Sequence, residues 1–459
     1  MIRLDRPRTA ADLVPRVERL FSLSAGKIRA LEDRWNTADG APVFTVEGRY
    51  HARGWTEWTQ GFQFGSALLQ YDATGEDAFL ELGRSRTFER MAPHLTHTGV
   101  HDHGFNNVST YGALWRLARE GRLDPPTGER RAVELALQVS GAVQALRWTR
   151  TPDGGFIHSF NGAHSLFVDT IRSLRALALA HQLGHRLLGE QDAPVDLLAR
   201  LVGHARATAQ YSVYYGQGRD TYDVRGRVAH ESLFNPANGS YRGPSTQQGY
   251  SPFTTWTRGL AWAMLGFAEQ LEFMSSLPDE ALAPAGGRTD VERWMREAAA
   301  AACDFYVDQA AAADGIPYWD TGAPGLAALG GWSSRPADPF NDHEPVDSSA
   351  AAIAAQGLLR YGRYCAGAGD GGARYEQAGL LILETLFDER GPYLSTDPSH
   401  EGLLLHSVYH RPNGWDHVPA GARTPRGEAS QWGDYHAREA ALYVLRLATG
   451  APHLTFFAG

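Results

Sequence analysis

The chain has 459 residues and a formal net charge of −9, with 43 Lys and Arg residues against 52 Asp and Glu residues. An acidic chain without a basic stripe disfavours a nucleic-acid-binding function. Lys27 is the only lysine, so Schiff-base and phosphate-loop lysine mechanisms are excluded unless this residue serves them. The 12 tryptophans suit either a large core or stacking against carbohydrate.

The cysteine content and the hydropathy of the chain indicate the cellular compartment in which it is expected. Cys303 and Cys365 lie in alanine-rich helical contexts, which predicts buried thiols rather than a disulfide. The N-terminal stretch MIRLDRPRTAADL is polar and lacks the apolar core of a signal peptide. No apolar run is long enough to cross a membrane. We therefore expect a soluble, cytoplasmic protein that binds neither nucleic acid nor membrane.

Helical periodicity bounded by Gly, Pro and Asn clusters predicts twelve helices. In chain order they span residues 10–36, 58–73, 78–91, 103–120, 129–148, 168–185, 193–213, 257–273, 289–311, 347–363, 374–388 and 434–449. Strand signals are weak and local, and no low-complexity linker divides the chain. Twelve helices suggest six helical hairpins closed into a double ring. The predicted fold is all-α, an (α/α)6 barrel that forms one domain over residues 1–459.

Unusual motifs open every second predicted helix. In chain order these helices begin with WTQGF, HDHGF, FVDTI, WTRGLAW, VDSSAAA and WGDYHA. If they form the inner ring, six helix N-termini surround one mouth, and their unpaired N–H groups would attract an anionic group. Aspartate also belongs at helix starts as a cap, and capping is the favoured interpretation of Asp347 and Asp434.

Asp169 and Asp102 are harder to explain as caps alone. Asp169 lies in HSLFVDTIRSLRAL, where Phe167, Val168 and Ile171 flank it. Desolvation by such neighbours raises the pKa of a carboxyl group, which would keep Asp169 protonated near neutral pH. Asp102 has histidines beside it in HTGVHDHGF, and these favour its charged form. The pair could divide acid and base roles, although such pairs are often structural.

Four histidines, at positions 94, 97, 101 and 103, surround Asp102 in the sequence. Such a cluster raises the question of a metal site. The spacing is not that of a helical HExxH motif, and no nearby cysteine completes a ligand set. We expect hydrogen-bonding histidines, no metal and no other cofactor.

The stretch TQQGYSPFTTWTRGLAW is rich in groups that could bind a sugar. Gln247 and Gln248 offer amides, Trp256 and Trp262 offer flat indole faces, and Arg258 offers a fork for a carboxylate. The structural alternative is a helix start whose tryptophans pack in the core and whose arginine pairs with a structural acid.

These motifs resemble those of the unsaturated glucuronyl hydrolases, glycoside hydrolase family 88, over most of the chain. HDHGF is similar to the family's HDxGF, FVDTIRSL to its IIDxxMNL, and QQGYSPFTTWTRGLAW to its HQGY…WARGQAW. The resemblance places the two key aspartates on Asp102 and Asp169. It places substrate contacts on Trp58, His101, Phe160, His230, Gln248, Trp256, Arg258 and Trp262. Phe160 stands where the family usually has a tryptophan, and the loop 325–344 looks longer than usual.

The resemblance implies a hydrolase that releases a 4,5-unsaturated uronic acid from the non-reducing end of lyase-generated oligosaccharides. Hydration of the enol-ether double bond would be followed by loss of the remaining glycan. Asp169 would protonate C4 and then accept a proton from water, while Asp102 would orient the ring hydroxyls and stabilise developing positive charge. We expect a monomer or homodimer whose partner is the unsaturated uronyl oligosaccharide.

Three alternatives stay open. An unsaturated rhamnogalacturonyl hydrolase shares the fold and the reaction, and would consume galacturonyl-rhamnose products instead. A sugar isomerase of the N-acylglucosamine epimerase type shares the barrel but uses histidine acid–base chemistry. A sugar-binding protein without catalysis is the non-enzymatic alternative, and the presence of both Asp102 and Asp169 argues against it.

Overall fold

The computed structural model describes residues 1–54 and 57–457, and it is mostly helical. Its α-helices are α1 (Ala10–Arg34), α2 (Gln60–Thr74), α3 (Asp77–Arg90), α4 (Ala92–Leu95), α5 (His103–Asn107), α6 (Ala113–Arg119), α7 (Thr127–Leu146), α8 (Thr170–Ser173), α9 (Arg175–Gln182), α10 (Leu197–Tyr211), α11 (Thr257–Ser275), α12 (Asp279–Leu282), α13 (Arg288–Phe305), α14 (Ser348–Gly367), α15 (Ala373–Leu386) and α16 (Gln431–Thr449). Every predicted helical segment contains helix, so the prediction of a helical protein is confirmed.

Two of the predicted helices are interrupted. The segment predicted as 103–120 contains α5, a π-helical turn over Val108–Gly112, and α6. The Thr110 hydroxyl donates to the Asn106 carbonyl oxygen at 2.8 Å, and such a side-chain bond competes with the backbone ladder. The segment predicted as 168–185 is divided into α8 and α9.

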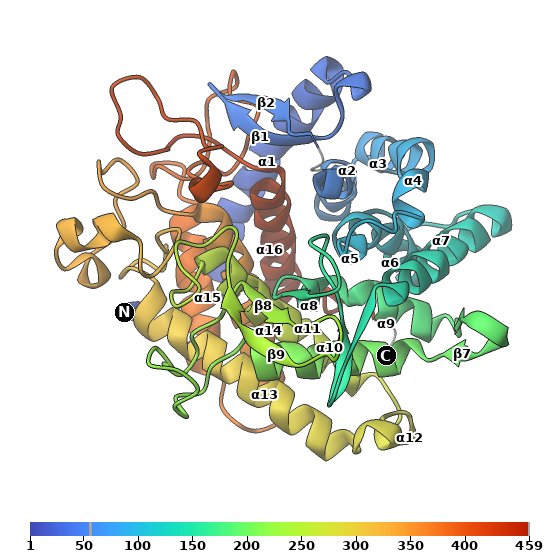
Figure 1. The fold of residues 1–459 in the computed structure, drawn as a ribbon. Coiled ribbons are helices and arrows are strands. Elements are labelled where there is room, and N and C mark those ends of the chain that lie inside the picture. Colours follow the sequence, from blue (N-terminus) through green and yellow to red (C-terminus); the bar gives the residue numbers. More distant parts are fainter. Residues whose placement is uncertain (55–56, 458–459) are drawn as a thin grey trace.

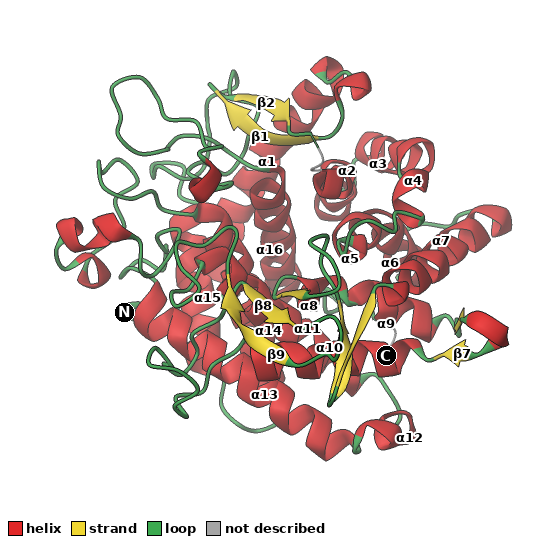
Figure 2. Ribbon diagram, in the orientation of Figure 1, coloured by secondary structure: helices red, strands yellow, loops and turns green. Residues whose placement is uncertain are grey.

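The chain also contains short strands (Figure 2). They are β1 (Pro42–Val46), β2 (Arg49–Ala52), β3 (Trp148–Thr151), β4 (Gly154–Ile157), β5 (Ser165–Phe167), β6 (Leu187–Leu188), β7 (Pro194–Val195), β8 (Glu231–Phe234) and β9 (Tyr241–Ser245). Three sheets are two-stranded and antiparallel, and the fourth has the antiparallel order β5-β8-β9. In β5, Ser165 pairs with Leu233 of β8, and this pairing leads the chain directly into α8.

Six helices of the described residues contact one another in a closed cycle. In order these are α2, α5, α8, α11, α14 and α16, with α16 returning to α2. We call them the inner helices. They correspond to the even-numbered helices of the predicted twelve. The helices α1, α3, α7, α10, α13 and α15 each contact an inner helix, and Figure 1 shows α3, α7 and α13 at the periphery.

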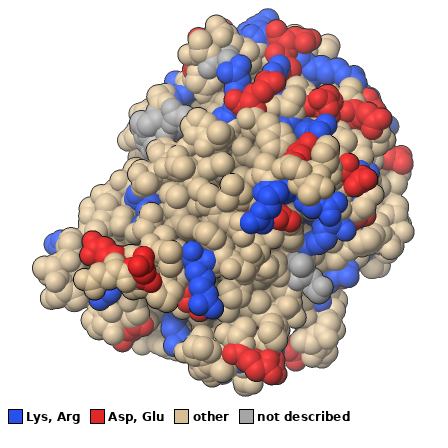
Figure 3. Space-filling model, turned by 90° about the vertical axis from the view of Figure 1, so that its right-hand side faces the viewer, with Lys and Arg blue, Asp and Glu red and all other residues tan. Residues whose placement is uncertain are grey.

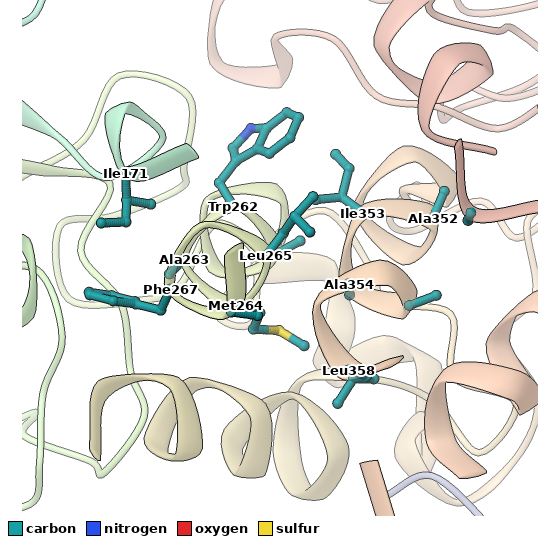
Figure 4. Close-up of a cluster of buried hydrophobic side chains, with 14 of the residues drawn as sticks. Ile171, Trp262, Ala263, Met264, Leu265, Phe267, Ala352, Ile353, Ala354 and Leu358 are labelled. Carbon is teal, nitrogen blue, oxygen red and sulfur yellow. The ribbon is translucent and has the colours of Figure 1, made fainter. Parts of the chain in front are cut away.

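The inner helices pack closely because small residues line their contacts. Figure 4 shows Met264 and Leu265 of α11 beside Ile353 and Leu358 of α14. A Cβ atom at Gly357 of α14 would lie 2.8 Å from the backbone nitrogen of Leu265, so a larger residue would push the helices apart. The principal core cluster runs from the N-terminal to the C-terminal part of the described chain. Both cysteines are free and buried, as predicted.

Two further features are the distribution of charge on the surface and the hydropathy of the helices. On the face in Figure 3, basic and acidic side chains are interspersed around broad uncharged areas, without a continuous basic stripe. Within residues 1–54 and 57–457, no helix combines the length and apolar composition that crossing a bilayer requires.

Candidate active site

The starts of the inner helices meet at one end of the molecule. His101 lies within 4 Å of carboxyl oxygens at the starts of both α5 and α8, at 3.7 and 3.3 Å. Arg258 of α11 contacts Asp347, the N-cap of α14, at 2.9 Å. Trp432 of α16 stacks on Trp58, which lies just before α2, with ring centroids 5.1 Å apart. The contacts agree with the prediction that these N-termini surround one mouth.

A cavity opens between these helix starts. Nine of the ten site residues predicted from the sequence line it: Trp58, His101, Asp102, Phe160, Asp169, Gln248, Trp256, Arg258 and Trp262. The tenth, His230, lies behind the wall, as described below. Segments separated by hundreds of residues in the chain therefore converge on one cavity.

Close approach of α5 to α8 places the two aspartates together. A Cβ atom at Gly104 would lie 2.3 Å from the Ser173 carbonyl oxygen, so only glycine permits this contact. The Ser173 hydroxyl accepts from the Gly104 N–H at 2.8 Å and donates to the His101 carbonyl oxygen at 2.6 Å. These hydrogen bonds join the two motifs that carry Asp102 and Asp169, about one helical turn from their carboxyl groups.

Asp102 and Asp169 stand at N-cap positions without acting as caps. Each precedes the first residue of its helix, α5 or α8, and neither side chain makes a capping hydrogen bond. Asp347 does cap α14, because its side chain accepts from the N–H groups of Ser349 and Ala350. Asp434 has another role: it lies inside α16 and accepts from the N–H groups of the 403–404 segment. The capping prediction is confirmed for Asp347 and wrong for Asp434.

His101 lies between the two carboxyl groups. Its Nε2 is 3.3 Å from Asp169 Oδ1, which is a hydrogen bond, and 3.7 Å from Asp102 Oδ1. Both aspartates are 8% exposed and His101 is 1% exposed. Burial lowers the pKa of His101, but the charges of both aspartates and the hydrogen bond to Asp169 outweigh it, and the pKa is raised. The imidazole therefore favours its protonated form beside the two acids.

The pKa shifts of the two aspartates run in directions opposite to those predicted. Burial raises the pKa of Asp102, and this effect exceeds the opposing one of His101. Burial also acts to raise the pKa of Asp169, as its apolar flanks predicted. The hydrogen bond and charge of His101, together with the charge of His230, outweigh this burial, and the pKa of Asp169 is lowered. The sequence could not reveal which carboxyl group the imidazole approaches more closely.

The other histidines of the cluster turn toward different partners. His94 Nε2 bonds to Gln60 Oε1 at 3.0 Å, and His103 Nδ1 bonds to Ser140 Oγ at 3.1 Å. Burial lowers the pKa of both His94 and His103 to about 4. Within the described residues, no three His, Cys, Asp or Glu side chains are grouped to hold a metal ion.

Arg258 joins three parts of the cavity wall. Its Nη1 contacts Asp347 and the Val408 carbonyl oxygen, and its Nη2 donates to Gln248 Oε1 at 2.9 Å and the Tyr409 carbonyl oxygen at 2.7 Å. The side chain is 1% exposed. Arg258 therefore pairs with a buried acid, as the structural alternative proposed. It also lines the cavity.

His230 supports the wall rather than lining it. Its Nδ1 accepts from the Gln247 N–H at 3.0 Å, and its ring packs against Phe167 and Trp256 at 4.5 and 4.7 Å. Burial lowers its pKa to about 4. His230 thereby places the loop of Gln247 and Gln248, while its Nε2 has no hydrogen-bond partner among the described residues. Its predicted role in holding sugar oxygens stays a prediction.

Aromatic rings form most of the cavity. Trp262 and Trp256 are 2% and 3% exposed and lie deep, while Phe160 is 36% exposed at the opening. Phe160 stacks near His101, with ring centroids 5.9 Å apart. Trp58 is half-buried on the α16 side. A cavity that combines aromatic rings with polar side chains suits a sugar ring, whose C–H faces pack on indole and whose hydroxyls form hydrogen bonds.

The sequence prediction missed several lining residues. They are Phe105, Phe167, Tyr409, His410, Asn413 and Trp415. The first two lie inside motifs that were recognised. The last four lie in a segment without helical periodicity, and the only signal there was an isolated tryptophan in RPNGWD.

Comparison with known proteins identifies the family. The model of Glycosyl Hydrolase Family 88 matches residues 34–285. The chain belongs to this family. It is therefore a glycoside hydrolase, and the match includes both cavity aspartates and the stretch from Gln247 to Trp262.

Relatives of the chain extend over nearly its whole length. The unsaturated glucuronyl hydrolase of Bacillus sp. strain GL1 is 26% identical over 444 residues, covering 94% of this chain and 96% of that protein. The unsaturated chondroitin disaccharide hydrolase of Streptococcus pyogenes serotype M1 is 24% identical over 408 residues, covering 87% and 84%. A crystal structure of the Bacillus sp. GL1 enzyme has a TM-score of 0.69 at 23% identity, covering 95% of this chain and 97% of that one. That structural likeness concerns the fold.

Proposed function

We propose that the protein releases a 4,5-unsaturated uronic acid from the non-reducing end of lyase-generated oligosaccharides by hydrating the enol-ether double bond. The observation that carries this proposal is the pair Asp102 and Asp169, buried at the base of an aromatic cavity and bridged by His101. The related unsaturated glucuronyl and chondroitin disaccharide hydrolases support the substrate class. We further propose a single-domain (α/α)6 barrel, which the closed cycle of inner helices supports.

The reaction needs one proton at C4 and one water oxygen at C5 of the unsaturated sugar. An acid donates its proton to C4, and the positive charge that develops at C5 and the ring oxygen is quenched by water. The conjugate base takes the proton that this water releases. The product is a hemiketal at C5, which opens and expels the remaining glycan from C1. No cofactor is needed, because every step is a proton transfer or an addition of water.

Asp169 is the proposed acid, acting in a pair with His101. One proton is shared across their hydrogen bond, so the titration belongs to the pair rather than to either group. The raised pKa of His101 favours retention of this proton. Asp102, whose pKa is raised by burial, is placed to bond the ring hydroxyls and to stabilise positive charge as it develops.

The binding roles follow the depth of the cavity. Trp256 and Trp262 wall the deep part, where the unsaturated ring must lie to reach the acids. Gln248, held by Arg258, offers an amide toward the same space. His230 and Arg258 position this wall, and Phe160 and Trp58 complete the aromatic enclosure.

The test uses matched unsaturated and saturated disaccharides with the purified protein. Loss of the alkene ultraviolet absorbance should accompany cleavage of the unsaturated compounds from hyaluronan, chondroitin, heparin, ulvan or pectin. The saturated counterparts, which lack the enol ether, should be cleaved far more slowly. In labelled water the oxygen should appear at C5 of the uronic acid product. Rapid cleavage of a saturated glucuronide with label at C1 would replace hydration by ordinary glycoside hydrolysis.

The same panel separates the alternatives. Cleavage of the galacturonyl-rhamnose product alone would identify a rhamnogalacturonyl hydrolase. Interconversion of free sugars without loss of an alkene would identify an isomerase. Binding without turnover would identify a sugar-binding protein.

A further inference from the structure

A buried aspartate outside the cavity wall bonds to the turn that carries Gln248. Asp320 is 0% exposed, and it is not among the described residues that line the cavity. Its Oδ2 accepts from the Tyr250 N–H and its Oδ1 from the Gly322 N–H, each at 2.9 Å. One carboxyl group therefore joins its own segment to a turn that lies 70 residues earlier in the chain.

Side chains hold the backbone of this turn. We call residues 246–250 the glutamine turn, and its four consecutive N–H groups from 247 to 250 all donate to side chains. The acceptors are His230 Nδ1 for Gln247 and Gln248, at 3.0 and 3.4 Å, Thr246 Oγ1 for Gly249 at 2.9 Å, and Asp320 Oδ2 for Tyr250 at 2.9 Å. These side chains therefore determine where the turn lies relative to the cavity.

The segment that carries Asp320 is itself fixed against the start of α11. An antiparallel bridge pairs Asp320 with Trp256, which lines the cavity. Beside this bridge, the Thr257 N–H donates to the Trp319 carbonyl oxygen at 3.1 Å. The carboxyl group that holds the glutamine turn therefore has a defined position relative to the cavity wall.

Burial works against the ionised form of Asp320. It raises the pKa of this carboxyl group to about 6, and the N–H groups of Gly322 and Tyr250 oppose that rise. An asparagine would fill nearly the same volume without a charge, but it could accept through only one oxygen. The second acceptor oxygen is therefore what distinguishes aspartate at this position.

Gln248 is the cavity residue that depends on the glutamine turn. Its Oε1 accepts from Arg258 Nη2 at 2.9 Å, so its NH2 group is the donor that the amide offers to a sugar oxygen. Arg258 holds the end of this side chain, and the turn holds its backbone. A shift of the turn would therefore displace the NH2 group even with Arg258 in place.

We propose that Asp320 is a positioning residue for substrate binding, which holds the glutamine turn through the Tyr250 N–H so that Gln248 presents its amide to the terminal unsaturated sugar. This inference rests on the proposed function, which supplies that sugar. The carboxyl group of Asp320 bonds to the turn and to its own segment, not to the sugar or the catalytic acids. Its loss should therefore weaken binding and leave the chemical step intact.

The first experiment measures KM and kcat of Asp320→Asn. The substrate is the unsaturated disaccharide that the wild type cleaves fastest among those from hyaluronan, chondroitin, heparin, ulvan and pectin. KM should rise about tenfold, the size expected for loss of one hydrogen bond to a charged group, while kcat stays within about twofold. The matched control is Asp314→Asn, which should change neither constant. Asp314 also accepts two backbone N–H bonds, from Ile316 and Ala337, and burial also raises its pKa to about 6.

A second variant perturbs the same contact from the side of the turn. A Cβ atom at Gly249 would lie 3.0 Å from Asp320 Oδ2, so Gly249→Ala pushes the turn away from the carboxyl group. It should raise KM as Asp320→Asn does, and it decides by the same criteria if Asp320→Asn does not fold. The matched control is Gly379→Ala, because a Cβ atom there would be equally crowded, 2.8 Å from the Leu359 side chain, in α15. This control should leave KM unchanged.

The second experiment asks whether Asp320 acts through Gln248. Gln248→Ala should raise KM by itself, and adding Asp320→Asn to it should raise KM by no more than about twofold further, because the group that Asp320 positions is already absent. A further tenfold rise in the double variant would overturn the proposal. So would an unchanged KM in Asp320→Asn, or a loss of kcat as large as the rise in KM. A wild-type protein that consumes none of the disaccharides would refute the proposed function, and this inference with it.

Discussion

Two groups of buried charges lie close together along α8 and differ in how they are paired. At the helix start, Asp102 and Asp169 have His101 as their shared bridge. One turn further on, Arg172 begins a network of arginines and glutamates. It pairs with Glu269 at 3.2 Å and with Glu439 at 2.6 Å. The members of this network are Arg172, Arg175, Arg360, Glu269, Glu272 and Glu439.

The network pairs three arginines with three glutamates, whereas at the mouth one histidine faces two aspartates. Burial raises the pKa of Glu439, but the charges of Arg172 and Arg175 outweigh it and the pKa is lowered. The carboxylate of Glu439 therefore favours its ionised form. At the mouth the cation is an imidazole, whose pKa lies within reach of neutral pH. The proposed proton transfer therefore belongs to the mouth, where a histidine faces the two carboxyl groups.

The largest expected effect is on catalysis at the mouth. Asp169→Asn should lower kcat by about a hundredfold to ten-thousandfold while the substrate still binds, because an amide cannot donate the C4 proton. Single-turnover loss of alkene absorbance and equilibrium binding of the disaccharide would measure the two effects. Near-normal turnover in this variant would remove Asp169 from the mechanism.

Asp102→Asn provides the companion measurement at the same site. It should also reduce the rate, and it should shift the pH profile. The negative charge of Asp102 raises the pKa of His101, so removing it lowers that pKa. The alkaline limb of kcat/KM should therefore move to lower pH. An unchanged limb would mean that His101 does not share the functional proton.

The next effect is on stability in the network. Glu439→Gln should lower the free energy of unfolding by about 3–5 kcal/mol, because it leaves buried arginine charge without its partner. Glu389→Gln is the control, since Glu389 pairs with Arg19 at 2.8 Å on the surface with side chains 49% and 46% exposed. Exposed pairs contribute about 0–1 kcal/mol. Urea unfolding would compare the two variants, and similar losses in both would erase the distinction between network and surface.

The smallest effect concerns a buried carboxyl group that belongs to neither region. Burial raises the pKa of Asp314 to about 6. The folded state therefore binds more protons than the unfolded state between its ordinary pKa and pH 6, and acidification favours folding. Relative to Asp314→Asn, the wild type should gain about 1–3 kcal/mol of stability between pH 7 and pH 4. Urea unfolding at both pH values would measure this difference, and a constant difference would contradict the raised pKa.

Much of the fold followed from local patterns. Every second predicted helix lies among the inner helices, because the apolar spacing and the helix-start motifs are properties of short segments. The interruption at Val108–Gly112 was not foreseen, because it depends on a side-chain bond that competes with the backbone. The cavity-lining segment 409–415 was missed because its residues follow no period and are held by contacts with Arg258 and Asp416.

The sequence by itself determined the helical segments, the two aspartates at neighbouring helix starts and nine of the residues that line the cavity. The tertiary structure alone decided the protonation preferences of those aspartates. Asp169 is flanked by apolar residues as the sequence indicated, yet its pKa is lowered because His101 lies 3.3 Å from it and 3.7 Å from Asp102. Local sequence sets desolvation, whereas the interaction between charges depends on distances that only the folded chain defines.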